Sequence, residues 1–131
     1  MDIQRPDVTE EQIEQMVRLF YSRASADADL GPVFAAHVQD WEAHYKIVAG
    51  FWSQGLLGTQ RYKGSPYSVH LNLGIKIEHF ARWLELFRAA ATEVLPEPAA
   101  KMAIGRAEHM AKSFKMGLFP LETLPGMPHA V

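Results

Sequence analysis

The most constraining feature of this sequence is a set of polar-tipped rings placed on otherwise apolar helical faces. Hydrophobic residues recur at three- and four-residue spacing in three segments, and each segment includes one such ring: Tyr21, His44 or Trp83. A polar group buried without a partner costs about 1–3 kcal/mol, so rings of this kind need partners in the interior. On three separate helices they predict a polar pocket inside an apolar shell, which suits a large flat cofactor and a small reactant.

Composition limits the classes of protein to which the chain can belong. Its 131 residues are 48% hydrophobic and 21% charged, which is typical of a single globular domain that needs no disulfide. The net charge of −2, without a stripe of lysine or arginine, argues against nucleic-acid binding. No apolar run reaches the length of about 18 residues that is needed to span a membrane. We also find no apolar signal segment at the N-terminus and no cysteine. We therefore expect a cytoplasmic protein without thiol chemistry.

The hydrophobic period predicts an all-α fold. The expected long helices run from about 10 to the low twenties, 41–57, 76–94 and 98–118, with a short helix after a turn at 30–34. A capping box at Thr9 and Gln12 opens the first helix. Asp40 can cap the second long helix and Gly58 can end it. Residues 68–73 can form one further helical turn, and no segment alternates as a strand does.

One histidine stands apart because it lies on a short connector between two long helices. A histidine on an apolar face is more often a core residue bonded to a carbonyl than a ligand, and Tyr21 and Trp83 can equally be core anchors. His70, on its short element, can face a flat cofactor from one side while His44 faces it from the other. His79, near the start of the third long helix, is the first rival for the role of ligand.

Other site chemistries fit less well. A Glu-x-x-His pair is not repeated on two helices, which argues against a di-iron bundle. His44 and His70 lack a third ligand at a spacing typical of zinc. No glycine-rich phosphate loop follows a strand, and sequence order reveals no Ser-His-Asp arrangement.

At these residues the chain resembles the truncated haemoglobins, most closely the third of the three bacterial groups. The matching segments, in family order, are Leu19-Phe20-Tyr21, Leu30-Gly31-Pro32-Val33-Phe34, Asp40-Trp41-Glu42-Ala43-His44, Gly50-Phe51-Trp52, Tyr62-Lys63-Gly64-Ser65-Pro66, His70-Leu71-Asn72-Leu73 and His79-Phe80-Ala81-Arg82-Trp83-Leu84-Glu85-Leu86-Phe87. The absence of a Gly-Gly pair favours the third group, since the other two usually carry such pairs at helix junctions.

The resemblance implies a compact two-over-two helical globin that holds one haem b. The whole chain, 1–131, would be a single haem domain, with a core of about 9–118 and an extended tail at 119–131. His70 matches the proximal iron ligand, and the distal side would carry Tyr21, His44 and Trp83.

Further positions follow from the same resemblance. Phe34, Val48 and Trp52 would line the haem pocket. Arg61, Tyr62 and Lys63 would meet the haem propionates, or else belong to a solvated loop. For His44 we favour a gate over a permanent donor or a sixth iron ligand.

These residues favour tight binding of dioxygen and redox chemistry on it. A phenol O–H and an indole N–H can both donate to dioxygen, which slows its release and helps to break its O–O bond or to steer its reaction with nitric oxide. Nitric-oxide dioxygenation and peroxidase-like cleavage both fit, and each needs a separate reductase. Two alternatives stay open: an oxygen or nitric-oxide sensor or store without turnover, and a cofactor-free helical interaction domain.

Overall fold

Five α-helices make up the part of the chain that the computed structural model describes, residues 7–60 and 77–118. They are α1 (Glu10–Ala26), α2 (Gly31–His37), α3 (Trp41–Leu57), α5 (Ile77–Val94) and α6 (Glu97–Leu118). Those residues contain no strand, and each expected helix is found close to its predicted bounds, so the predicted all-α class is confirmed. The turn predicted at 68–73 and the tail at 119–131 lie outside the described residues.

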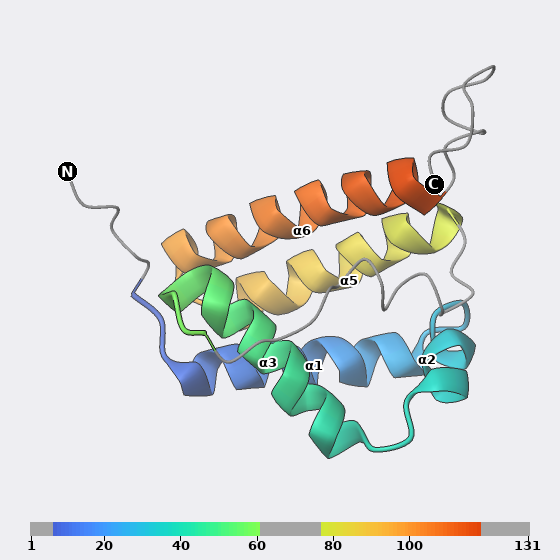
Figure 1. The fold of residues 1–131 in the computed structure, drawn as a ribbon, viewed down its shortest axis with the longest axis horizontal. Helices are drawn as coiled ribbons and strands as arrows, with labels where there is room; N and C mark the ends of the chain where they lie inside the picture. The colour runs from blue at the N-terminus through green and yellow to red at the C-terminus, as the bar shows by residue number, and fades with distance from the viewer. Residues whose placement is uncertain (1–6, 61–76, 119–131) are drawn as a thin grey trace.

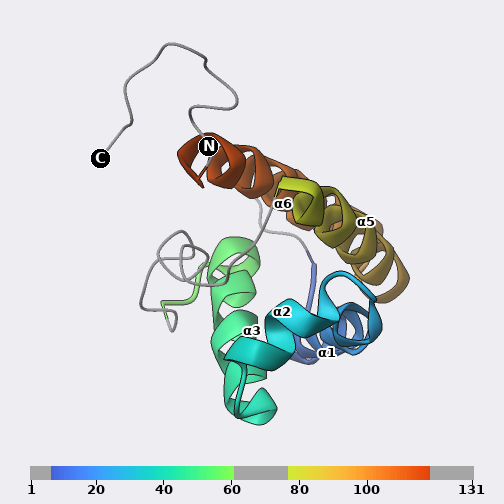
Figure 2. The ribbon, with the colours of Figure 1, turned by 90° about the vertical axis from the view of Figure 1, so that its right-hand side faces the viewer.

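The helices pack as two pairs, one laid over the other. α5 and α6 run side by side in opposite directions, and α3 crosses α1 on the other side of the molecule (Figure 1). The view in Figure 2 separates α5 and α6 from the group formed by α1, α2 and α3. Because α1 packs on α5 and α3 packs on α6, the two pairs share one hydrophobic core. This is the two-over-two arrangement that the resemblance implies.

Local signals set the helix boundaries. The Thr9 hydroxyl accepts from the Gln12 N–H at 3.1 Å, and the Gln12 side chain accepts from the Thr9 N–H at 3.0 Å, which completes the predicted capping box. The Asp40 carboxylate accepts from the Ala43 N–H at 3.2 Å at the start of α3. Gly58 ends α3 in the left-handed region, with φ of 77°. The predicted start of α1 and both ends of α3 are confirmed.

Small side chains bring α5 and α6 close together, since the distance between packed helices depends on the side chains at their contact. Among the α6 side chains that the structure describes, the buried ones are alanines, and the last turns of α5 add two more: Ala99, Ala100, Ala103, Ala107 and Ala111, with Ala90 and Ala91. This close pair leaves the large rings of α5 to fill the space toward α1 and α3.

Packed aromatic rings join α1, α3 and α5. Phe20 of α1 meets Trp83 and Phe87 of α5 edge to face, with ring centroids 6.0 and 5.8 Å apart. Phe87 in turn stacks on Trp83 at 5.9 Å and on Trp52 of α3 at 4.8 Å. Stacked and edge-to-face pairs are the arrangements that aromatic rings prefer, so these contacts fix the relative positions of the three helices that carry most of the predicted site.

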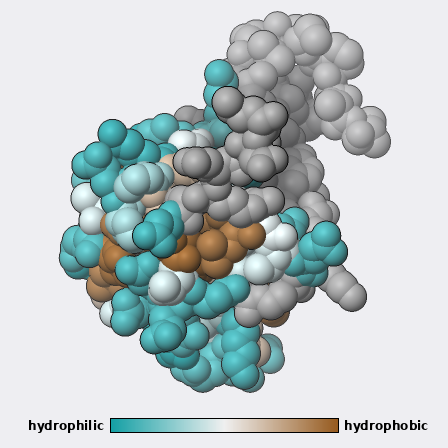
Figure 3. Space-filling model, turned by 90° about the vertical axis from the view of Figure 1, so that its left-hand side faces the viewer, coloured by the Kyte–Doolittle hydropathy of each residue, from teal (hydrophilic) through white to brown (hydrophobic). Residues whose placement is uncertain are grey.

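The surface is mostly polar. Figure 3 looks at the side where α3 ends and α5 turns into α6, and shows an apolar area in the middle of a hydrophilic face. Among the described residues, the large hydrophobic side chains that are exposed are Ile47 and Met102, and scattered exposures of this kind are normal. No described helix meets the length and hydropathy that a bilayer span requires.

Gly31 lies where the backbones of α1 and α2 approach closely, which gives a test of the fold. A Cβ added at Gly31 would lie 2.6 Å from the Ser25 carbonyl oxygen, so Gly31→Ala must displace backbone. We expect it to lower the free energy of unfolding by about 1–3 kcal/mol in chemical denaturation. Gly105→Ala is the matched control, because an added Cβ there meets no atom within 4 Å, and it should raise that free energy by about 0.4–1 kcal/mol. Similar effects of the two changes would contradict the close approach.

Candidate functional site

Tyr21 lies at the centre of a cluster of rings from α1, α2 and α3. Its ring centroid is 4.8 Å from that of His44, 5.4 Å from Phe34, 5.7 Å from Trp41 and 6.2 Å from Tyr45. His44 and Phe34 both meet it edge to face, at 78° and 86°. The structure therefore brings together three of the predicted site residues, Tyr21, His44 and Phe34, from three different helices.

The turn between α1 and α2 places Phe34 in this cluster. The Asp27 carboxylate accepts from the backbone N–H groups of Asp29 and Leu30, each at 3.0 Å. Its other oxygen accepts from Nε of Arg82 on α5 at 2.6 Å. The Arg82 hydrogen bond, more than the two backbone bonds, holds the pKa of Asp27 below its usual range, so the carboxylate stays charged and the turn stays tied to α5.

His44 is held between two rings. Its ring centroid lies 5.7 Å from that of Trp41, with an interplanar angle of 86°, while Tyr21 contacts it as well. The side chain as a whole is half-buried, and its Nε2 atom is buried. An imidazole nitrogen among these rings can donate or accept a hydrogen bond.

Burial keeps the Tyr21 phenol protonated. The side chain is only 8% exposed, and this burial, with a smaller contribution from Tyr45, raises the pKa of Tyr21 far above its ordinary value. A protonated phenol is a hydrogen-bond donor. The environment therefore favours Tyr21 as an O–H donor and disfavours it as a charged base or nucleophile.

Two predicted tryptophans lie in the aromatic core beside this cluster. Trp83 contacts Phe20, and Phe20 meets the neighbouring Tyr21 at 4.8 Å. Trp52 joins the same core through its stack on Phe87. Both are buried, so the structure links them to the Tyr21 cluster through phenylalanine rings.

The remaining candidate residues lie partly inside and partly outside the described part of the chain. Val48, one helical turn beyond His44, is half-buried and packs against the hydrophobic core. Arg61, Tyr62, Lys63 and His70 lie outside the described residues. Across 7–60 and 77–118, no three histidine, aspartate or glutamate side chains form a group that could hold a metal ion.

Sequence reasoning assigned no role to Trp41 and Tyr45, although both contact Tyr21. A signal was available, because Trp41 lies three residues before His44 and Tyr45 directly follows it. Ring-bearing residues this close to a candidate histidine on an apolar helical face are expected to share its surroundings.

Comparisons with known proteins agree with this architecture. Residues 9–116 match the family model described as bacterial-like globin. The chain is 31% identical over 117 residues to the Group 3 truncated hemoglobin ctb of Campylobacter jejuni. The aligned region covers 86% of this chain and 92% of that protein. The crystal structure of the group III truncated hemoglobin from Campylobacter jejuni superposes with a TM-score of 0.80 and 31% identity, covering 91% of this chain and 96% of that one.

The protonation state of Tyr21 has a measurable consequence. Burial raises the pKa of Tyr21 in the folded protein, whereas a tyrosine in an unfolded chain ionises near a pH of about 10. Above that pH the folded state keeps a proton that the unfolded state has lost, so the free energy of unfolding falls as pH rises. We expect Tyr21→Phe to remove this part of the fall, measured by chemical denaturation at a series of alkaline pH values. An unchanged slope in the variant would contradict a buried, protonated phenol.

Proposed function

This chain belongs to the bacterial-like globin family as a group III truncated haemoglobin, and we propose that it binds dioxygen tightly and carries out redox chemistry on dioxygen, nitric oxide or peroxide. Binding of a small gas ligand at a haem follows from the family itself. The finer proposal is supported above all by one observation: the buried Tyr21 phenol ring lies 4.8 Å from the His44 imidazole, centroid to centroid. A phenol and an imidazole, both able to form hydrogen bonds, thus lie side by side among aromatic rings.

The described residues suit a haem. Rings of Phe34, Trp41 and Tyr21 pack together from three helices, and sites for flat cofactors are lined mainly by hydrophobic and aromatic side chains. We propose that the group is haem b and that His70 is its iron ligand, as the resemblance implies. When bound, the haem supplies an iron on which the gas ligand sits and through which electrons reach it.

We assign Tyr21 and Trp83 as hydrogen-bond donors to the gas ligand. The raised pKa of Tyr21 keeps its O–H in place, and an indole N–H is a donor only. Donors held by a rigid aromatic core need no reorganisation when negative charge develops on the ligand, and they act more strongly where water is excluded. They therefore slow ligand release and favour reactions in which the ligand gains charge.

Turnover also requires an electron source. Oxidation of nitric oxide by dioxygen to nitrate consumes one electron for each nitric oxide molecule. We propose that a separate reductase supplies it, and that the protein works in the cytoplasm beside such a partner. A store or sensor would need no such supply, which gives the functional test its basis.

Removing either donor should speed the release of dioxygen. Loss of one hydrogen bond to a charged acceptor costs about 1.5–3 kcal/mol, which corresponds to about a ten- to hundred-fold faster dissociation. We expect this range for both Tyr21→Phe and Trp83→Phe in stopped-flow measurements on the haem-loaded protein. Release at the parental rate in both variants would contradict the assignment of these donors.

The same proteins distinguish turnover from storage. Supplied with a reductase and its electron donor, the parent should consume many equivalents of nitric oxide for each haem. Both donor variants should consume it more slowly. Consumption in the parent that stops at one equivalent would instead identify a store or sensor.

We propose His44 as a gate to the bound ligand. It lies in the first half of α3, where it contacts Tyr21 and Trp41. A neutral imidazole at this position can form a hydrogen bond inward or rotate outward. Direct ligation of iron by His44 would occupy the site that the two donors serve.

His44→Leu separates the gate from iron ligation. We expect the ferric spectrum at neutral pH to keep the same spin state in the parent and the variant, while gas ligands bind the variant faster. A low-spin, bis-imidazole spectrum in the parent that becomes high-spin in His44→Leu would show that His44 ligates the iron.

A further inference from the structure

The two halves of α3 are held to the rest of the protein in different ways. All buried residues of this helix lie in its second half: Ala49, Gly50, Trp52, Ser53 and Leu56. The first half carries His44 and contributes side chains that are half-buried or exposed. The hydrophobic core thus holds the second half of α3 more completely than the first half, whose Trp41, Tyr45 and Val48 pack against it while still partly exposed.

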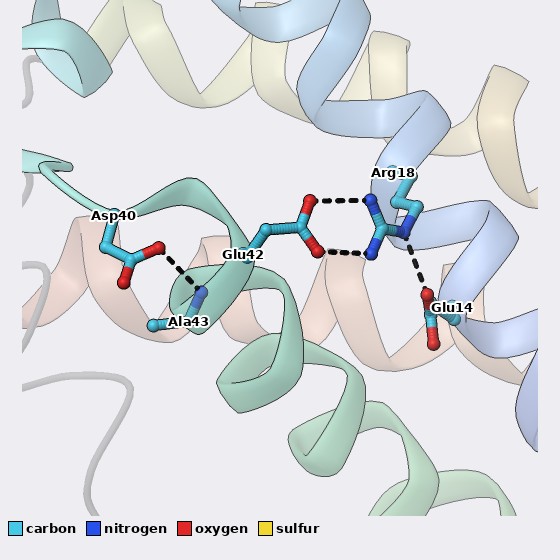
Figure 4. Close-up of polar contacts among 5 residues, drawn as sticks. All are labelled: Glu14, Arg18, Asp40, Glu42 and Ala43. Carbon is cyan, nitrogen blue, oxygen red and sulfur yellow. Dashed lines mark hydrogen bonds and ion pairs between the residues drawn. The ribbon is translucent and has the colours of Figure 1, made fainter.

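Arg18 of α1 binds the first half of α3 through Glu42 at the protein surface. Its two terminal nitrogens donate to the two carboxylate oxygens of Glu42 at 2.9 and 2.7 Å. Its Nε donates to Glu14, one turn back on α1, at 2.8 Å. Figure 4 shows how Glu14 binds one edge of the guanidinium group while the opposite edge faces Glu42. The Asp40 cap on Ala43 fixes the same turn of α3, so the pair joins two ordered helical segments.

The same guanidinium group reaches the ring cluster. Its central carbon lies 4.8 Å from the Tyr45 ring centroid, within the range of a cation–π contact. Tyr45 adjoins His44 in sequence and contacts Tyr21 in space. One side chain on α1 therefore connects an ion pair on the surface with the rings that surround the gate.

We propose that Arg18 is a positioning residue for access of gas ligands: its bidentate pair with Glu42 latches the first half of α3 onto α1 and holds His44 against Tyr21. This proposal rests on the proposed function, because the latch controls access only if His44 is the gate. Bidentate arginine–carboxylate pairs fix geometry as well as distance. The two side chains are 41% and 65% exposed, so solvent and salt weaken the pair, as suits a latch that has to open.

The first test compares the parent with Arg18→Gln, both loaded with haem, using carbon monoxide as the gas ligand. Exposed ion pairs contribute amounts that convert to about a two- to five-fold change in an equilibrium. We expect carbon monoxide to bind the variant about two- to five-fold faster. Added salt should raise the rate of the parent toward that of the variant and leave the variant unchanged. Equal rates at low salt would overturn the proposal.

Arg23→Gln is the matched control. Arg23 lies on the same helix and makes an equally short bidentate pair with Glu93, at 2.6 and 2.8 Å, with side chains 36% and 51% exposed. This pair joins α1 to α5 instead of α3, so its loss should leave the binding rate at the parental value. Acceleration equal to that of Arg18→Gln would show a general loosening of the fold and would overturn the latch.

A charge exchange tests whether the pairing itself matters. Arg18→Glu and Glu42→Arg, made singly, should each speed carbon monoxide binding, because they place like charges together. The double variant should return part of the way toward the parental rate, since it restores opposite charges across the same helices but leaves Glu14 beside a like charge. A double variant as fast as the single ones would contradict a role for the pair.

Amide hydrogen exchange over residues 41–48, without gas ligand, separates failure of the latch from failure of the proposed function. We expect faster exchange there in Arg18→Gln than in the parent, and no change over this segment in Arg23→Gln. Faster exchange with unchanged carbon monoxide binding would overturn the role of the latch in access. A parent that binds no gas ligand would refute the proposed function, while the exchange comparison would still decide whether the latch exists.

Discussion

Two neighbouring rings on α1, Phe20 and Tyr21, join the hydrophobic core to the candidate site, so the rest of the structure depends on where α1 holds them. Their ring centroids are 4.8 Å apart, yet successive helical residues point about 100° apart around the axis, so the two rings serve different regions. Phe20 meets Trp83 and Phe87 of α5 and organises the dry core. Tyr21 meets His44 of α3 and organises the candidate site. Any shift of α1 therefore moves core and site together.

Ion pairs around the perimeter set the positions of helices that the core has brought together. Each joins a pair of elements through an arginine: Arg18–Glu42, Arg23–Glu93, Arg82–Asp27 and Arg88–Glu108. Exposed pairs contribute about 0–1 kcal/mol, less than a single large buried side chain, and among these partners only the Asp27 carboxylate is buried. Stability therefore comes mainly from the rings and the alanine-lined contact of α5 with α6. The arginines instead fix which helices face one another. This matters most at the first half of α3, where residues 41–48 are only half-buried or exposed.

Local features of the fold were predictable from sequence, and contacts between distant segments were not. Thr9, Asp40 and Gly58 marked helix ends correctly because caps act within a few residues. Periodicity placed Tyr21 and His44 on apolar faces, but their contact depends on how α1 crosses α3, which no short pattern specifies. The family resemblance supplied that expectation. Arg18 and Glu42, 24 positions apart, carried no such signal, since surface charges occur on almost every helix.

The contrast between positions 20 and 21 argues that the site has a function beyond folding. In a core built for stability alone, a second phenylalanine would fill the position of Tyr21 without a phenol that needs a hydrogen bond. The structure instead places that phenol beside an imidazole, with the Tyr21 side chain only 8% exposed, and burial raises its pKa. Buried polar groups in an otherwise aromatic cluster, where an apolar side chain of similar size would fit, are typical of functional sites. A ligand that binds the folded state alone then raises the stability of that state by mass action.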